Sequence, residues 1–271
     1  MKFRPSALVA ALGVAMAMPA TAQTFSNTIY FGDSLTDSGT FIPALIQIAG
    51  PGAATVGKFT TNPYQVWSEQ LARRYGVQLA PSNQGGTNYA VGGARAGAAA
   101  TGPFGAIPSV TSQVSTYLSA NGGRADANAL YSVWAGGNDM LAVLSGAPAQ
   151  ATIGAAVASQ VQAVGALAAA GAQYILVPTL PDLGLTPTAR ALGAGGMAAA
   201  TGGSTAYNTA LYGGLTSAGL SYIPVDTFNL LREIVANPSL YGITNTTATA
   251  CGTVSSVQCS PSNYVAPGVA E

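Results

Sequence analysis

Short apolar runs alternate with longer stretches of helical periodicity along the chain. The short runs are rich in β-branched and aromatic residues and end at Gly, Pro or a polar turn, which predicts buried strands. Stretches with apolar residues three and four positions apart predict helices. The expected strands cover residues 27–31, 130–134, 174–177 and 220–225, and the expected helices cover residues 63–75, 149–170, 204–218 and 227–236. This alternation is typical of an α/β domain with a mostly parallel sheet that helices cover on both faces.

Two stretches rich in Gly and Ala interrupt the pattern, at residues 92–105 and 192–203. Gly weakens both helices and strands because it loses the most conformational freedom on folding. We expect loops or loosely packed helix ends there, and not linkers between domains.

The first 22 residues have the pattern of a secretory signal peptide. Two basic residues precede a short apolar run, which ends before an Ala-x-Ala cleavage site at Ala20–Ala22. The run is too short for a transmembrane helix, which needs about 20 apolar residues. We expect cleavage after Ala22, one domain over residues 23–271, and export to the periplasm, the outer-membrane surface or the medium.

Composition excludes several classes of protein. Hydrophobic residues make up 49% and charged residues 7%, the opposite of a disordered chain. Nine basic residues balance nine acidic ones, so no basic excess points to a nucleic-acid partner. The sequence contains no His and two Cys, so neither a metal centre nor a cofactor is expected. In an oxidising compartment, Cys251 and Cys259 are expected to form a local disulfide.

Short motifs for nucleotide binding and for the common serine hydrolases are absent. Residues 52–59 approach a phosphate-binding loop, but Phe59 stands where Ser or Thr must bind Mg²⁺. The sequence has no Gly-x-Ser-x-Gly nucleophile turn.

Three polar turns follow strand-like segments. The strand over residues 27–31 leads into Gly32-Asp33-Ser34-Leu35, and similar turns stand at residues 86–90 and 136–139. Ligands bind at the carboxyl edge of open parallel sheets, which is where Ser34 is expected to lie. Each turn alone needs no functional explanation, because Gly, Asn and Asp are the common residues of turns that follow strands. Three turns in register favour a shared site, where Gly amides and the Asn side chain could bind an oxyanion.

These turns resemble the first three motif blocks of the GDSL, or SGNH, esterase/lipase family. The resemblance extends over residues 26–240, and three further stretches fit: residues 57–62, 92–94 and 180–187. It is closest to exported bacterial esterases, which are often autotransporter passengers. It implies a three-layer α/β/α sandwich of the flavodoxin-like type, and hydrolysis of lipid or small-molecule esters without a cofactor.

The resemblance also implies a role for each site residue. Ser34 is expected to be the nucleophile that forms an acyl-enzyme. The amides of Ser34 and Gly86, with the side chain of Asn138, are expected to form the oxyanion hole. Asp33 and Asp139 are expected to hold the loops in place without taking part in the chemistry.

The sequence departs from the family at its catalytic base. The family ends with an Asp-x-x-His block, and this sequence contains no His. A Ser hydroxyl is a weak nucleophile without a group that takes its proton. Lys58, the only Lys after cleavage, is a poor substitute because it falls in a loop-like motif. We therefore expect a carboxy-terminal truncation, and an outer-membrane barrel as a partner segment outside this chain.

Two functional classes stay open at this stage. The chain is either a secreted ester hydrolase without its third catalytic block or a non-catalytic exported binding or adhesin domain on the same fold. The absence of His favours the second class, and the presence of Ser34, Gly86 and Asn138 favours the first.

Overall fold

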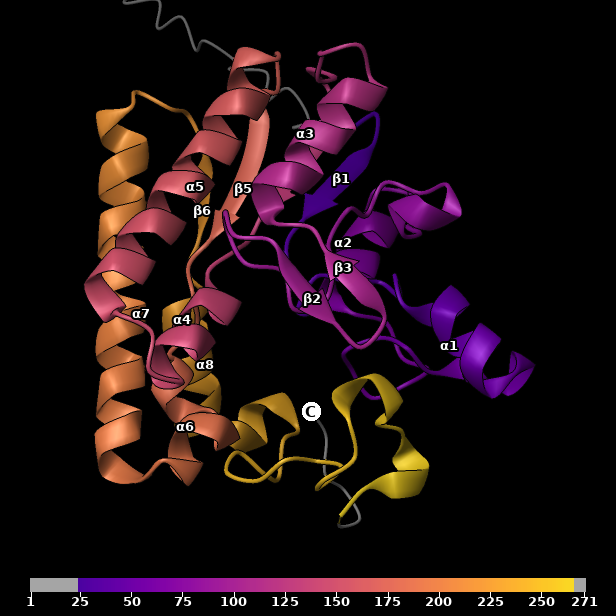
Figure 1. Cartoon of the computed structure of the whole chain (residues 1–271), viewed down its shortest axis with the longest axis vertical. Coiled ribbons are helices and arrows are strands. Elements are labelled where there is room, and N and C mark those ends of the chain that lie inside the picture. Colours follow the sequence, from indigo (N-terminus) through magenta and orange to yellow (C-terminus); the bar gives the residue numbers. More distant parts are fainter. Residues whose placement is uncertain (1–23, 266–271) are drawn as a thin grey trace, which may run out of the picture.

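A four-stranded parallel sheet forms the centre of the molecule in the computed structural model, which describes residues 24–265. The predicted signal peptide lies outside the described residues. In spatial order the strands are β1 (Thr28–Phe31), β4 (Leu130–Val133), β5 (Tyr174–Pro178) and β6 (Ile223–Val225). Because every neighbouring pair is parallel, all carboxyl ends meet at one edge of the sheet (Figure 1). The fold is the expected α/β architecture.

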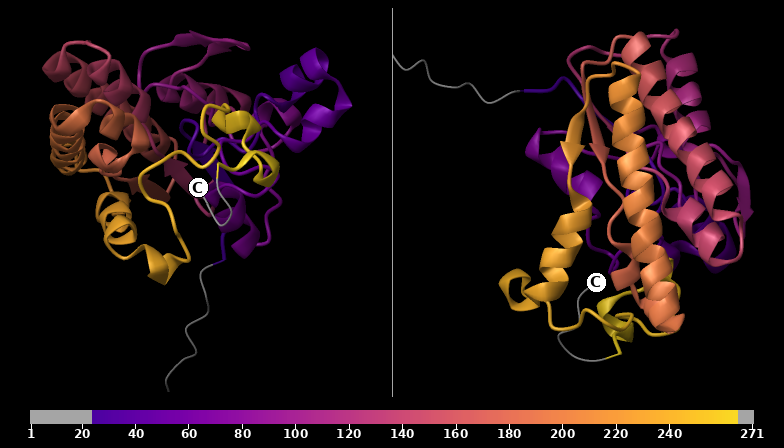
Figure 2. Two further views of the ribbon diagram at one scale, coloured as in Figure 1. Left: turned by 90° about the horizontal axis from the view of Figure 1, so that it is seen from below. Right: turned by 90° about the vertical axis from the view of Figure 1, so that its left-hand side faces the viewer.

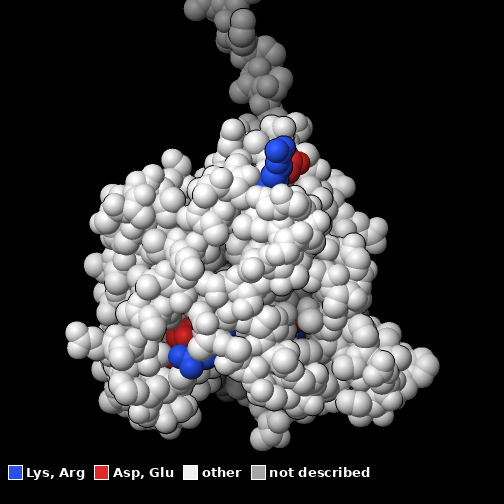
Figure 3. All heavy atoms as spheres, turned by 45° about the horizontal axis from the view of Figure 1, so that its top comes forward, with Lys and Arg blue, Asp and Glu red and all other residues white. Residues whose placement is uncertain are grey.

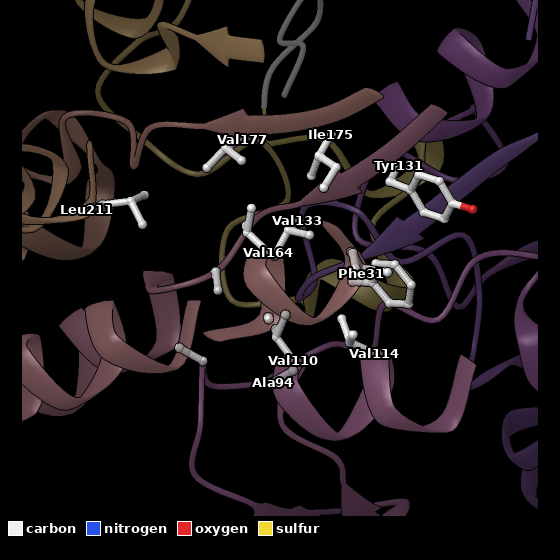
Figure 4. Close-up of a cluster of buried hydrophobic side chains, with 14 of the residues drawn as sticks. Phe31, Ala94, Val110, Val114, Tyr131, Val133, Val164, Ile175, Val177 and Leu211 are labelled. Atoms are coloured by element: carbon white, nitrogen blue, oxygen red, sulfur yellow. The ribbon is translucent and has the colours of Figure 1, made fainter. Parts of the chain in front are cut away.

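Three long helices cover one face of the sheet. They are α3 (Val110–Ala120), α5 (Ala149–Ala169) and α7 (Gly193–Ser217), and α5 lies between the other two. Side chains that point from alternate strand positions toward these helices form the core, where Phe31, Tyr131 and Val133 are fully buried (Figure 4). The long helix α5 is apolar enough to cross a membrane by length and composition, but it packs against α3, α4 and α7.

The opposite face carries α2 (Trp67–Arg74) beside β1, and α8 (Thr227–Ala236) follows β6 (Figure 2). The rings of Tyr30 and Trp67 meet edge to face with centroids 5.5 Å apart. The predicted helix over residues 63–75 is shorter in the structure. Its first turn begins at Trp67 because the Glu69 carboxylate accepts the Val66 amide at 3.0 Å and caps the helix there.

Shorter elements surround the carboxyl edge. They include α1 (Ile42–Ala49), α4 (Gly137–Leu144), α6 (Pro187–Ala191) and a hairpin of β2 (Ala100–Gly102) and β3 (Gly105–Ile107). Single 3-10 turns complete the chain at Pro51–Thr55, Ser82–Gln84, Leu183–Leu185, Pro238–Tyr241, Ser256–Gln258 and Pro261–Asn263. The stretch 92–105, which we expected to be a loop or a helix end, is irregular up to residue 99 and then contains β2 and the first residue of β3.

Residues 193–203 form the amino-terminal half of α7, so of the two alternatives for this stretch the loop is wrong and the helix end is found, with tighter packing than expected at Ala200 and Gly203. Helix α7 begins at Gly193, directly after its N-cap Leu192, and includes the rest of this Gly/Ala-rich stretch. Tertiary packing explains the difference: a Cβ at Gly203 would lie 2.2 Å from Cε of the buried Met140 on α4. Glycine therefore lets α7 approach α4 closely, and this contact offsets its low helix propensity.

A disulfide joins Cys251 and Cys259, whose Cα atoms are 5.6 Å apart. The buried Asn62 connects this segment to the rest of the molecule. Its side-chain amide donates to the carbonyl oxygens of Val257 (3.3 Å) and Cys259 (3.1 Å), and its backbone amide donates to Cys259 O (2.7 Å). The carboxy-terminal segment is thereby held against the loop of residues 57–62.

Candidate active site

Ser34 lies in a tight turn just beyond the carboxyl end of β1. The chain leaves the strand through Gly32, where a Cβ would lie 2.8 Å from the carbonyl oxygen of Trp134, so a larger residue does not fit. The Asp33 carbonyl accepts the Thr36 and Asp37 amides, both at 3.0 Å, and closes the turn. Ser34 is half-buried, and within residues 24–265 neither its hydroxyl nor its amide has a hydrogen-bond partner.

The segment that precedes the hairpin runs alongside β1 and its following turn. The amide of Val91 donates to Gly32 O at 3.1 Å, and the amide of Gly92 donates to the Asp37 carboxylate at 2.8 Å. The next residue, Gly93, has a φ of +84°, a left-handed conformation that favours glycine. No described residue accepts its amide proton.

The third polar turn connects β4 to α4. Gly136 has a φ of +105°, and a Cβ there would lie 2.5 Å from the ring of Tyr207, so only glycine fits this turn. The side-chain amide of Asn138 donates to Ala94 O at 2.9 Å. An Asn amide carries two protons, so the second stays available for a ligand.

Contacts between the loops bring their candidate residues together. A Cβ at Gly137 would lie 3.1 Å from the Asp33 carboxylate, which places the neighbours of Asn138 and Ser34 in contact. Asp139 accepts the Ala96 amide and the Arg95 guanidinium, both at 2.9 Å. Asp139 therefore connects the turn after β4 to the loop of residues 94–96, and the Asp33 carboxylate accepts the Leu35 amide at 3.1 Å within its own turn.

Gly86 does not share this arrangement. Its amide donates to Pro81 O at 3.0 Å, and a Cβ there would lie 2.0 Å from Ala80 O. Gly86 is thus a turn residue whose only backbone proton is already used, and this geometry does not support it as an oxyanion donor. Gly93 fits that role better because its amide is unpaired and its neighbour Ala94 binds Asn138. The sequence contained the Gly-Gly pair at residues 92–93, but it did not show which Gly amide stays unpaired after folding.

Burial keeps the carboxylates under the site from ionising easily. Burial, opposed by a hydrogen bond from the Leu35 amide and reinforced by the nearby Asp139, raises the pKa of Asp33 to about 7. Burial also raises the pKa of Asp37, although four hydrogen bonds, among them those from Thr40 and Gly92, work in the opposite direction. Within residues 24–265 no group of three acidic, Cys or His side chains is arranged to hold a metal ion.

The described site contains no base for the Ser34 proton. Lys58, considered for this role, has its ammonium 2.7 Å from the carboxylate of Glu69, and both side chains are largely buried. A charged, paired ammonium has no lone pair to accept a proton. The arrangement therefore offers a nucleophile and candidate oxyanion donors, and the printed sequence offers no His to activate the nucleophile.

Comparison with known proteins finds similarity to one family of lipases and esterases. The sequence profile of the GDSL-like lipase/acylhydrolase family matches residues 29–262. Lipase 1 of Photorhabdus luminescens is 35% identical over 177 residues, which cover 65% of this chain and 25% of that protein. Esterase EstA of Pseudomonas aeruginosa is 33% identical over 255 residues, which cover 81% of this chain and 38% of that protein. The chain spans between about a quarter and two fifths of the length of these relatives.

Proposed function

The chain belongs to the GDSL-like lipase/acylhydrolase family, and on that premise we propose that it binds a carboxylic ester with the carbonyl carbon at Ser34. One observation carries the proposal: the Ser34 hydroxyl is accessible and unpaired at the carboxyl edge of the sheet. The names of the two relatives, a lipase and an esterase, support the same reaction type.

The proposed reaction begins with attack of the Ser34 oxygen on the ester carbonyl carbon. The carbonyl oxygen becomes an oxyanion, which accepts hydrogen bonds from the amides of Ser34 and Gly93 and from the free amide proton of Asn138. Such donors stabilise the transition state more than the ground state, and each contributes about 10²–10³ in turnover. Collapse of this intermediate releases the alcohol and leaves an acyl group on Ser34, which water then removes.

The Ser34 hydroxyl proton needs an acceptor in this reaction. Imidazole in solution can supply that base, so it tests whether the base is the only catalytic group that the chain lacks. We measure hydrolysis of p-nitrophenyl butyrate by the 271-residue chain and by Ser34→Ala at increasing imidazole concentration. Because imidazole cleaves such esters by itself, the Ser34→Ala protein supplies the matched background. A rate above that background that rises with imidazole supports the proposal, and equal rates for the two folded proteins contradict it.

A non-catalytic ester-binding domain is the second candidate. The observation that favours it is the absence of His from the sequence, together with the pairing of Lys58 with Glu69. Saturable binding of an uncleaved ester, without any imidazole-dependent turnover at Ser34, would select this alternative.

Export is part of the proposal. The amino-terminal pattern and the Cys251–Cys259 disulfide both suit an oxidising compartment outside the cytoplasm. Mass spectrometry of protein recovered from the periplasm of a bacterial host should find Gln23 as the first residue, and an uncleaved cytoplasmic chain would contradict export.

A further inference from the structure

A cavity of about 460 Å³ lies between α1, the β2–β3 hairpin and α3. Figure 1 shows how these elements are arranged. We call it the aromatic cavity, because Phe41, Tyr89 and Phe104 line it together with Ala44 on α1 and Ala106 on β3. The rings of Phe41 and Phe104 lie 5.1 Å apart, and none of the lining residues is charged. Its size is that of a small-molecule site, which is typically about 300–1,000 Å³. The lining also contains uncharged polar residues: Thr40, Gln47, Ser82, Asn83, Gln113 and Thr116.

The floor of the aromatic cavity is joined to the turn that carries Ser34. Gln113 lines the cavity, and its side-chain amide both accepts the Gly32 amide and donates to the Gly32 carbonyl, each at 2.9 Å. Val91, another lining residue, donates its amide to the same carbonyl. The cavity therefore rests on the backbone two residues before Ser34.

The aromatic wall also touches the loop that carries Gly93. A Cβ at Gly92 would lie 2.1 Å from the ring of Phe59 and 3.0 Å from that of Phe41, and the two rings have centroids 6.2 Å apart. A Cβ at Gly93 would lie 3.0 Å from Ile107, at the end of β3. The same loop thus faces the candidate oxyanion site and this apolar wall.

The segment around α1, beside the cavity, is uncharged as well. Residues 38–57 contain no charged side chain, and α1 projects from the body of the molecule in Figures 1 and 2. Ile48 on this helix is 73% exposed. Charged side chains are also sparse on the face drawn in Figure 3. An apolar group can approach such a surface without displacing water from charged side chains.

We propose that the aromatic cavity binds the acyl chain of the substrate, which makes medium-chain acyl esters the substrate class. The inference rests on the proposed function, since it assumes that the acyl carbonyl lies at Ser34. A flexible chain without charge fits an uncharged cavity whose lining residues Gln113 and Val91 bind the backbone two residues before Ser34. A second protein would need a larger surface than this cavity offers.

Binding of fatty acids tests the cavity independently of hydrolysis. The probes are the acids of six, eight, ten and twelve carbons, titrated calorimetrically into the 271-residue chain below their micelle concentrations. Affinity should rise about fourfold for each added methylene, which corresponds to about 0.8 kcal/mol, until the cavity is full. No binding, or binding without dependence on chain length, would overturn the proposal.

Cavity-filling variants locate the binding. Ala44→Trp places an indole into the cavity from α1, and Ala49→Trp adds the same group to an exposed position of that helix. Ala44→Trp should weaken dodecanoate binding at least tenfold, and Ala49→Trp should leave it within twofold. Ala106→Trp fills the cavity from the hairpin and replaces Ala44→Trp if that variant does not fold. Equal binding by the filled and control variants would place the acyl chain elsewhere.

The outcomes separate this inference from the proposed function. Length-dependent binding that Ala44→Trp weakens, without Ser34-dependent hydrolysis, supports the cavity and contradicts the reaction. Hydrolysis that depends on Ser34, with a preference for chain length that neither filling variant changes, supports the reaction and overturns the cavity.

Discussion

The side chain of Asn138 donates one amide proton to the carbonyl oxygen of Ala94, across 2.9 Å. This bond connects the turn after β4 to the loop that carries Gly93. It fixes the orientation of the amide group, so that its second proton points in a fixed direction. Preorganised donors of this kind need no rearrangement when charge develops on a substrate oxygen.

Asn138→Ala should therefore reduce the imidazole-dependent hydrolysis to the level of Ser34→Ala. Loss of one oxyanion donor costs about 10²–10³ in turnover, and the loop also loses its bond to Ala94. The assay is p-nitrophenyl butyrate hydrolysis at saturating imidazole. Asn128→Ala is the matched control, because this exposed residue precedes β4 at the opposite edge of the sheet. Retention of more than a tenth of the rate by Asn138→Ala would remove Asn138 from the site.

The pKa of Asp33 predicts a specific pH dependence of stability. Its folded value of about 7 is above the ordinary value of 3.8, so between these pH values the folded chain binds the proton more tightly than the unfolded chain. The contribution of Asp33 to the free energy of unfolding is then greatest at low pH and declines as the pH rises through this window. At about 1.36 kcal/mol per pKa unit, the decline has an upper bound of about 4 kcal/mol.

Asp33→Asn should remove this decline, because Asn carries no titrating proton and keeps an acceptor for the Leu35 amide. We expect the variant to gain about 1–4 kcal/mol relative to the parent chain between pH 4 and pH 8. Urea unfolding at several pH values measures the difference, which includes the relief of repulsion between Asp33 and the nearby Asp139 and Asp37. A difference that does not change with pH would show that Asp33 ionises normally in the folded chain.

The sequence indicated the fold and much of the site through local signals. Apolar runs located the strands, and the position of Ser34 and Asn138 after two of them placed both at the same edge of the sheet. The choice between Gly86 and Gly93 was not visible in the sequence, because it depends on which amide remains unpaired after folding. The start of α7 was missed for a related reason: the contact of Gly203 with Met140 joins residues far apart in the sequence.

Asn62 predicts how firmly the carboxy-terminal segment is attached. Its side-chain amide reaches four carbonyl oxygens, those of Val257 and Cys259 and those of Lys58 and Thr60 in its own loop. Asn62→Ala removes these four side-chain bonds, while the backbone amides of Gly57 and residue 62 still donate to Val257 O and Cys259 O. The free energy of unfolding should therefore fall by about 1–3 kcal/mol. Limited proteolysis should then cut residues 245–265 first. Asn229→Ala, in the exposed first turn of α8, should change neither result. Unchanged protection of this segment in Asn62→Ala would show that the backbone bonds from Gly57 and residue 62 hold it without the side chain.

The final prediction concerns a base attached to the chain. We add a carboxy-terminal segment that contains Asp-x-x-His, so that His can accept the Ser34 proton and Asp can orient it. The 271-residue chain should retain only a trace of hydrolysis, because oxyanion donors and binding alone give about 10³–10⁴ over water when triad members are missing. The extended chain should hydrolyse p-nitrophenyl butyrate several orders of magnitude faster, and Ser34→Ala in it should abolish the gain. A control extension with His replaced by Ala separates the chemistry of the base from stabilisation by the added residues. If the extended chain folds and stays inactive, the ester-binding alternative is correct; if the 271-residue chain already has full activity, a residue other than His accepts the proton.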